Sequence, residues 1–283
     1  MSSEDASAPA EPDASDEPGR PDSIVRRWWR PDGDPWATAL IVHGIAEHSG
    51  RYERTGAHLA SHGILVAAID LPGFGDRESP GHIDSWNEFR DATERGLDEV
   101  SALGHPTFLL GHSMGGLVAL DFVLHVWPQL AGLILSAPAL DAVVPGWKRN
   151  AARVLSETTP RMPIPNEVSA EMLSRDPAVG EAYFADPLVM TSNSARLGAE
   201  LLRTMGETRE GLSELDRPTL CIHGEDDELV PPEFSEPLGE LDCVDRRTYA
   251  GVRHEAFNEP EGPEIVDEIV EWMREQVPIR PHR

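Results

Sequence analysis

A glycine-rich run surrounds a serine near the middle of the chain. Residues 111–115 have the form G-x-S-x-G, and a further glycine stands at position 116. An apolar run precedes the motif and a helix-like run follows it, which is the strand–turn–helix setting of a nucleophile elbow. Small residues beside the serine suit a tight turn in which the helix crosses the strand closely. The pattern predicts Ser113 as a nucleophile at the start of a helix, above the edge of a sheet.

A serine hydroxyl is a weak nucleophile at neutral pH and needs a base within hydrogen-bond reach. In hydrolases built on a doubly wound sheet, the acid that orients the base comes next along the chain. Four adjacent carboxylates, residues 225–228, follow an apolar strand candidate. The spacing from His223 to Val230 favours Asp227 as the acid, with Asp226 as the next choice.

The base comes last in the same chain order. His254 follows the last strand candidate and precedes the final helix candidate. His282 lies in the tail, one residue from the end of the sequence, and is a poor competitor. The ordered set of Ser113, Asp227 and His254 predicts nucleophilic acyl transfer.

Acyl transfer also needs hydrogen-bond donors aimed at the developing oxyanion. One predicted donor is the backbone N–H of Met114, directly after the nucleophile. The other is the backbone N–H of Ile45, in the loop after the first central strand candidate, where Gly44 lets the backbone turn.

Two other chemistries are disfavoured by the residue order. His43, Glu47 and His48 read H-x-x-x-E-H, which is not the zinc-protease arrangement. Residues 73–75 resemble part of a dinucleotide loop but lack the third glycine and the helix. The sequence therefore predicts neither a metal site nor a cofactor.

The elements that must position these residues alternate along the chain. Helix candidates lie near residues 52–62, 86–103, 115–126 and 261–276. Alternating strands and helices imply a mostly parallel sheet with helices on both faces, which is an α/β fold. The strand candidates are short, and most are continuous and not alternating in polarity, as expected for strands buried on both faces: Thr38–Val42, Ile64–Ile69, Thr107–Leu110, Leu133–Ser136, Leu220–Ile222 and Arg247–Tyr249.

One region breaks the alternation. Residues 141–210 offer no strand candidate, only helix-like pieces with apolar spacing punctuated by prolines. A structureless loop of that length is uncommon, so a helical cap inserted over one end of the sheet is expected. The hydrolase core then comprises residues 23–140 and 211–283.

The first 22 residues form a separate segment of Ser, Ala, Pro, Asp and Glu. With almost no large apolar side chain, the segment cannot offset its ordering entropy by burial and is expected to be disordered. It has neither the basic start nor the apolar centre of a signal peptide, so a cytoplasmic location is expected. No window of the sequence is apolar enough for a transmembrane helix.

The charge balance limits the partners. Fifty acidic against 24 basic residues give a formal net charge of −26, and Lys148 is the single lysine. Nucleic-acid binding and charge-driven docking to anionic lipid both require a basic face. The charge balance therefore argues against either kind of partner. Two explanations of the acidity stay open: adaptation to high salt, and the codon usage of a GC-rich genome. With only Cys221 and Cys243, a disulfide-rich fold is excluded.

Taken together, these motifs resemble the monoacylglycerol lipases and their lysophospholipase-like relatives. The resemblance spans about residues 36 to 275 in order. It departs from the family pattern at residues 73–77, where the family usually has a histidine between the glycines and a serine after them. The motifs that carry it are residues 43–52, 111–116, 173–177, 183–188, 223–230 and 254–259.

The resemblance implies an α/β-hydrolase fold with a mobile helical cap and hydrolysis of a medium or long acyl ester of glycerol. It also implies that Glu47, Arg51, His112 and Tyr183 line the alcohol end of the pocket. The expected partner is a small acyl ester, with transient contact between the cap and a membrane surface and no obligate protein partner. Two alternatives remain: a broader carboxylesterase or lysophospholipase with the same triad, and an inactive hydrolase fold used as a binding module.

Overall fold

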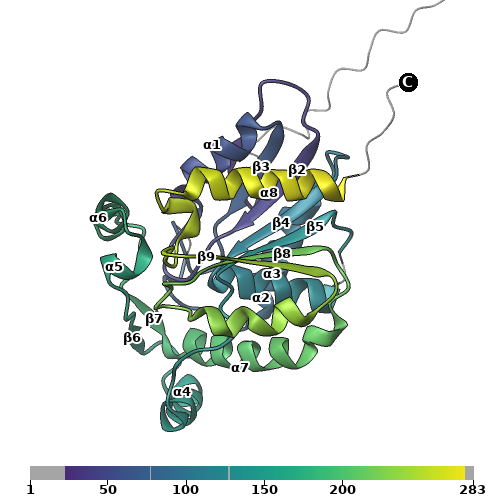
Figure 1. The fold of residues 1–283 in the computed structure, drawn as a ribbon. Helices are drawn as coiled ribbons and strands as arrows, with labels where there is room; N and C mark the ends of the chain where they lie inside the picture. Colours follow the sequence, from purple (N-terminus) through teal and green to yellow (C-terminus); the bar gives the residue numbers. More distant parts are fainter. Residues whose placement is uncertain (1–22, 77, 127, 278–283) are drawn as a thin grey trace, which may run out of the picture.

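A seven-stranded sheet forms the centre of the molecule in a computed structural model that describes residues 23–76, 78–126 and 128–277 (Figure 1). The strand order is β1-β3-β2-β4-β5-β8-β9, and every neighbouring pair except β1 and β3 runs parallel. The strands are β1 (Val25–Trp29), β2 (Ala37–Val42), β3 (Ile64–Ile69), β4 (Thr107–His112), β5 (Gly132–Ser136), β8 (Thr219–Gly224) and β9 (Val244–Tyr249).

Helices cover both faces of this sheet (Figure 1). Helices α1 (Glu53–Ser61) and α8 (Gly262–Gln276) lie on one face, while α2 (Asn87–Ser101) and α3 (Met114–Val126) lie on the other. Short 3-10 helices complete the core: η2 (Ser49–Tyr52), η3 (Leu212–Glu214), η4 (Pro232–Glu240) and η5 (Ala256–Asn258).

The central strands are mostly apolar, and both of their faces are buried. In β3, Ile64, Val66 and Ala68 join the hydrophobic cluster under α1 and α8, whereas Ala67 and Ile69 join the cluster under α2 and α3. Successive side chains of a strand point to opposite faces, so one uninterrupted apolar run serves two cores. The predicted α/β architecture with a mostly parallel sheet is confirmed.

The edge strand β1 is absent from the sequence prediction. Its sequence VRRWW buries only its two end residues, Val25 and Trp29, and its pairing with β3 contains an irregularity between Val25 and Arg27. An exposed, antiparallel edge strand needs neither alternation nor a continuous apolar run, so periodicity gives no signal for it. The predicted disordered tail, residues 1–22, lies outside the described residues.

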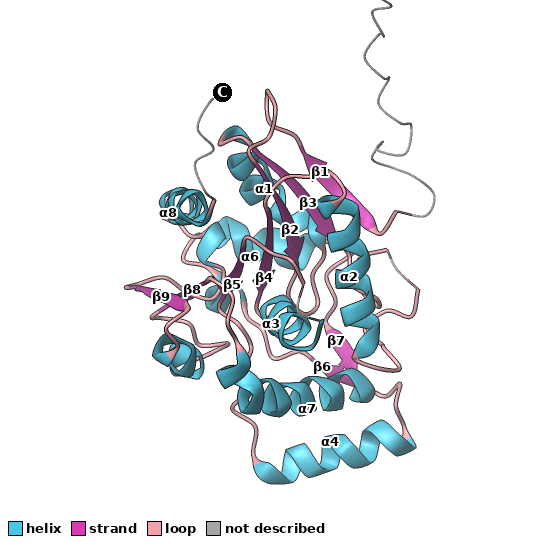
Figure 2. Cartoon of the chain, turned by 90° about the vertical axis from the view of Figure 1, so that its right-hand side faces the viewer, coloured by secondary structure: helices cyan, strands magenta, loops and turns pink. Residues whose placement is uncertain are grey.

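The segment predicted as a cap, residues 141–210, is mainly helical but holds a small sheet (Figure 2). The expectation that it contains no strand is wrong. Its two strands pair antiparallel across three positions, from Pro163↔Ser194 to Pro165↔Ser192, and neither is apolar enough to stand out. The elements are α4 (Gly146–Thr158), β6 (Pro163–Pro165), α5 (Ala170–Leu173), α6 (Pro177–Ala185), β7 (Ser192–Ser194) and α7 (Ala195–Gly211).

Helix α7 packs against α3, and α4 lies outside α7, farthest from the sheet (Figure 2). Among the described helices, none has a stretch long and apolar enough to cross a bilayer.

Candidate active site

The predicted nucleophile occupies the turn between β4 and α3. Ser113 has a φ of 54°, a left-handed conformation that is costly for any residue except glycine. Its N–H donates to the carbonyl of Ser136 on the neighbouring strand, 2.9 Å away. A Cβ at Gly111 would lie 2.3 Å from the carbonyl oxygen of Gly115, and one at Gly115 would lie 2.2 Å from that of Val42. The strand and helix cross so closely that only glycine fits at these two positions.

Of the four adjacent carboxylates, only Asp227 is buried; Glu225, Asp226 and Glu228 are exposed. Its Oδ1 accepts the N–H groups of Leu229 and Val230, each at 2.9 Å. Its Oδ2 lies 2.7 Å from Nδ1 of His254. This geometry joins Asp227, and not Asp226, to the predicted base.

The charge state of Asp227 follows from these contacts. Burial alone would raise the pKa of its carboxyl, but the charge of His254 and the hydrogen bonds from His223, His254 and the Val230 N–H outweigh it. The pKa therefore lies well below the ordinary value, and Asp227 is an anion at neutral pH.

His254 is buried at the carboxyl edge of the sheet, beside the loop that holds Ser113. Its ring centroid lies 4.7 Å from that of His112, the residue before the serine. Burial lowers the pKa of His254, but the charge of Asp227 and its hydrogen bond raise it further, to above the ordinary histidine value. Since Nδ1 faces Asp227, a neutral His254 that donates this bond leaves Nε2 free to accept a proton.

His223 supports the turn that carries the acid, a role that its place in the motif does not reveal. Its Nε2 lies 2.7 Å from the carbonyl oxygen of Val230 and 3.3 Å from Oδ2 of Asp227. Its Nδ1 lies 2.8 Å from the hydroxyl of Ser235. The ring is fully buried and fixes the turn that carries Asp227.

The loop after β2 is held in shape by its own glutamate. Oε1 of Glu47 accepts the N–H of Gly44 at 2.6 Å and the hydroxyl of Tyr52 at 2.7 Å. The Gly44 N–H is therefore occupied, which leaves the N–H of Ile45 as the next one along the loop. Ala46 follows with a φ of 67°. Met114 is the first residue of α3, so its N–H has no acceptor within the helix.

Glu47 also belongs to a buried ionic network. One guanidinium nitrogen of Arg51, Nη1, lies 2.6 Å from Glu47 Oε2 and 2.6 Å from Glu255 Oε1, and Nη2 lies 2.9 Å from Glu255 Oε2. Burial raises the pKa of Glu47, but the charge of Arg51 lowers it to about 2. The guanidinium carbon of Arg51 stands 4.7 Å from the ring centre of Tyr183 on α6. Three of the four residues predicted for the alcohol end thus meet in one cluster.

The fourth, His112, lies between this network and the base. Its Nδ1 is 3.1 Å from the hydroxyl of Ser136. Burial, followed by the charge of His254, lowers the pKa of His112 to about 4, so the ring is neutral at pH 7. A cavity of about 10 Å³, roughly the size of one water molecule, opens beside Glu47, Arg51, His112 and Glu255.

Glu255 and Tyr52 were not singled out from the sequence. Glu255 stands 204 positions from its partner Arg51, so no local spacing reveals the pair. The signal that could have found it is its place directly after the predicted base. The buried carboxylates Glu47, Asp227 and Glu255 each accept hydrogen bonds from arginine, histidine, tyrosine or backbone donors.

The inserted segment is tied to the loop that carries His254. The N–H of His254 donates to the carbonyl of Met172 at 3.4 Å, and that of Glu255 to the carbonyl of Leu173 at 2.8 Å. Nε of Arg175 lies 3.2 Å from Oε2 of Glu259, which is fully buried. The base is therefore held between the sheet and α5.

Comparisons with known proteins find a serine hydrolase family and individual lipid hydrolases among the similar sequences. A family model described as serine aminopeptidase, S33, matches residues 33–261. A monoacylglycerol lipase of Mycolicibacterium smegmatis is 34% identical over 88% of this chain and 92% of that protein. A phospholipase of Bacillus subtilis is 33% identical over 84% of this chain and 94% of that protein.

Solved structures give the same picture. The crystal structure of the monoacylglycerol lipase of Paleococcus ferrophilus matches with a TM-score of 0.81 at 30% identity, covering 89% of this chain and 99% of that one. A monoglyceride lipase of Saccharomyces cerevisiae, solved with a substrate analogue, has a TM-score of 0.80 at 22% identity, covering 89% of this chain and 91% of that one. At that identity the second match speaks for the fold alone.

Proposed function

Because the chain belongs to the serine aminopeptidase S33 family, and within it to the monoacylglycerol lipase-like α/β-hydrolases, we propose that it hydrolyses monoacylglycerols to glycerol and a free fatty acid. Hydrolysis of carboxylic esters is the activity of this family branch. The observation that carries the proposal is the buried Asp227 bound to His254 beside the strained Ser113.

In this mechanism Ser113 Oγ attacks the ester carbonyl while Nε2 of His254 takes its proton. Asp227 holds the ring in the required orientation and stabilises the imidazolium that forms. The backbone N–H groups of Ile45 and Met114 bind the oxyanion. As the tetrahedral intermediate collapses, His254 gives its proton to the departing glycerol oxygen. Water then attacks the acyl-enzyme by the same steps and releases the fatty acid. No cofactor takes part.

The glycerol hydroxyls are bound at the polar end of the site. The cluster of Glu47, Arg51, His112 and Tyr183 supports this assignment, since buried donors and acceptors select a ligand that can pair with them. Arg51 forms ion pairs with Glu47 and Glu255, so its proposed role is to hold Glu47 and Tyr183 in position.

In this proposal the inserted segment contacts the acyl chain of the substrate and the lipid surface from which the substrate comes. Val143, Trp147 and Val154 are 80%, 69% and 58% exposed on or next to α4, and Phe184 is 54% exposed on α6. Exposed apolar side chains of this size favour contact with an acyl chain or a lipid surface. In this proposal the enzyme acts in the cytoplasm and meets its substrate transiently at a membrane, with no nucleic-acid or obligate protein partner.

A second candidate is hydrolysis of lysophospholipids by the same triad. The similarity to the phospholipase of Bacillus subtilis favours it. The formal net charge of −26 speaks against those lysophospholipids whose headgroup has a net negative charge, because an acidic protein repels them.

A substrate panel distinguishes these activities. We expect the kcat/KM for 1-monooleoylglycerol to exceed that for oleoyl lysophosphatidylcholine and for p-nitrophenyl acetate by at least tenfold. An aminoacyl p-nitroanilide controls for the activity named in the family description. A higher kcat/KM for the lysophospholipid would replace the first candidate with the second.

A fluorophosphonate probe tests the chemistry separately from the substrate. It should add one phosphonyl group to Ser113 in the wild-type protein and none in Ser113→Ala. If the wild-type protein is not labelled, the chain is a hydrolase fold without hydrolase activity.

A further inference from the structure

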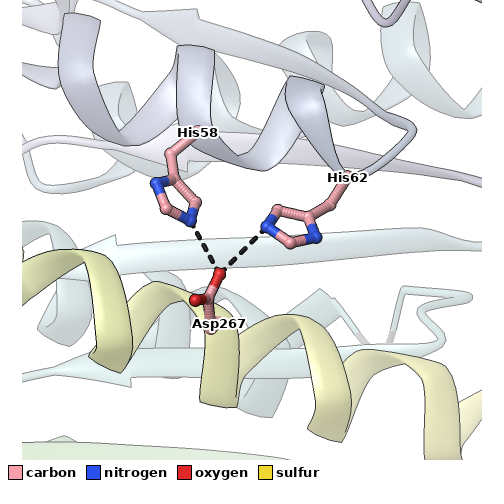
Figure 3. Close-up of side chains that lie close together, drawn as sticks. All are labelled: His58, His62 and Asp267. Carbon is pink, nitrogen blue, oxygen red and sulfur yellow. Dashed lines mark hydrogen bonds and ion pairs between the residues drawn. The ribbon is translucent and has the colours of Figure 1, made fainter.

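Three side chains that can bind metal converge on the outer side of the molecule, between α1 and α8 (Figure 3). His58 and His62 come from α1 and its end, and Asp267 comes from α8. Nε2 of His58 lies 2.7 Å from Oδ1 of Asp267, and Nε2 of His62 lies 2.9 Å from the same oxygen. None of the three belongs to the proposed catalytic site.

We propose that His58, His62 and Asp267 bind a divalent transition-metal ion of the zinc class. Two imidazoles and a carboxylate are ligands that zinc accepts, and together they provide three positions of a tetrahedron. Their ligand atoms all lie within 4.8 Å of one another.

The spacing of the histidines suits a shared ion. Residues four apart on a helix lie on the same face, one turn above the other. The two rings are stacked, with centroids 5.2 Å apart and planes inclined by 26°, and both direct Nε2 toward Asp267 (Figure 3). Two histidines at this spacing on a helix form half of many zinc sites.

The two histidine–carboxylate distances are close to those of a bound site. Ligands about 2.0–2.1 Å from zinc in a tetrahedron stand about 3.3 Å apart. The two nitrogen–oxygen distances must therefore widen by roughly half an ångström. The side chains are 29%, 33% and 51% exposed, so rotation about their bonds is unobstructed by core packing.

The backbone around the histidines adds an independent reason for a cation. Helix α1 ends at Ser61, so His58 and His62 stand at its carboxyl end, where the helix dipole favours positive charge. The carbonyl of His62 accepts the indole N–H of Trp36 at 2.8 Å, and that of His58 accepts the hydroxyl of Ser61 at 2.7 Å. These bonds fix the main chain that carries both ligands.

In this proposal the fourth coordination position is open to solvent on the side of His58. A cavity of about 280 Å³ adjoins His58 and is lined also by Arg54, Thr55 and Pro263. Water, or an anion attracted by Arg54, would complete the tetrahedron from this side. The positive charge of Arg54 also repels the metal ion. Because this repulsion weakens binding, both imidazoles are needed to hold the ion.

A bound ion would link two helices that are distant in the chain. His58 and Asp267 are 209 residues apart. A ligand that binds only the folded protein stabilises it in proportion to the logarithm of its concentration over Kd. Metal binding should therefore raise the melting temperature of the whole chain, and this effect does not depend on hydrolase activity.

The test uses the untagged, full-length protein after removal of metals with EDTA. Calorimetric titration with Zn²⁺ should give one ion per chain, and Co²⁺ should give the visible absorption of a four-coordinate ion. His62→Gln and Asp267→Asn retain hydrogen-bonding groups but are poor ligands, so each should weaken binding at least tenfold. Each should also reduce the metal-induced rise in melting temperature while leaving the EDTA-treated protein as stable as wild type.

Two matched variants make the result decisive. His125 is itself exposed and pairs with the buried carboxylate of Asp121, and His125→Gln should bind as wild type does. His282 lies outside the described residues, and His282→Gln should also bind normally. Absence of saturable one-to-one binding, binding unchanged in both ligand variants, or loss of binding in His282→Gln would each overturn the proposal.

Discussion

Two regions of the molecule reverse the usual distribution of polar and apolar groups. Around His254 the interior holds charged and polar side chains, among them Glu47, Asp227 and Glu255, each no more than 5% exposed. On α4 the surface holds Trp147, 69% exposed, and Val154, 58% exposed. Buried charge and exposed apolar surface are both unfavourable for an isolated folded chain, so each indicates function more strongly than an ordinary core does.

The two regions differ in how they are held. The polar region is fixed by hydrogen bonds to the sheet, to α5 and within itself, so every buried charge has a partner. Among the described helices, α7 is the only one against which α4 packs closely. This arrangement joins a firmly held polar centre to an outer helix whose apolar side chains are exposed.

The largest effect is expected from removing the charge of the acid. Asp227→Asn should lower kcat by about 10⁴-fold while the fold is kept, because the histidine loses its anionic partner and its required tautomer. Steady-state hydrolysis of a monoacylglycerol measures it. Asp226→Asn, at the exposed neighbour, is the control and should be mild. If the two effects were exchanged, the acid would be assigned one residue too late.

The next largest effect concerns the stability of the buried network. Arg51→Ala leaves Glu47 and Glu255 buried without their cation, which should cost about 3–5 kcal/mol of unfolding free energy. Urea unfolding measures this. Arg54→Ala removes an exposed arginine three residues away and should change the free energy by no more than about 0.5 kcal/mol. Equal effects of the two substitutions would show that the network adds nothing to stability.

A smaller effect concerns acid stability. Because the pKa of His112 is about 4 when folded against 6.5 for an ordinary histidine, the unfolded chain binds the extra proton as the pH falls below 6.5. From pH 7 to 5 this should remove about 2 kcal/mol of stability. His254 acts in the opposite sense, since its pKa is raised and its contribution is complete below the unfolded value.

His112→Gln removes the contribution of His112 to the loss of stability in acid. The loss of unfolding free energy between pH 7 and pH 5 should be smaller in His112→Gln than in wild type. Chemical unfolding at the two pH values provides the measurement. A variant that loses as much stability as wild type would show that other groups cause the acid sensitivity.

The smallest effect is expected on α4. Trp147→Ser should lower the rate on monoacylglycerol presented in phospholipid vesicles about tenfold, since an inserted aromatic side chain contributes about 1.5–3 kcal/mol. The rate on a short, dissolved ester and the unfolding free energy should hardly change. Asn150→Ser, on the same helix, is the control. An equal loss on both substrates would assign Trp147 to the acyl pocket and not to the lipid surface.

Local patterns predicted much of this structure. The apolar run Ile64–Ile69 coincides with β3, and the glycine-rich motif coincides with the turn between β4 and α3. Such features depend on neighbours in sequence, which strand periodicity and turn chemistry report directly. The structure brings His254 to within 2.7 Å of Asp227, and its role as the base stays a prediction from the chain order of the hydrolase fold.

What the sequence left open depends on contacts across the fold. Asp226 and Asp227 differ in burial, which no spacing within the acidic run determines. Arg51 and Glu255 meet only because η2 and the loop after β9 lie side by side. β1 and the pair β6–β7 are edge or isolated strands whose partners, and not their composition, make them strands.

The strand order also has a consequence for synthesis on the ribosome. β4, which presents Ser113, lies in the middle of the sheet, whereas β8 and β9, which precede Asp227 and His254, are added on one side of it. A nascent chain can form the serine turn before β8 and β9 have been made, and it lacks the proposed base until residue 254 has been added. In the proposed mechanism, a product truncated between Ser113 and His254 carries the serine without the base that would activate it.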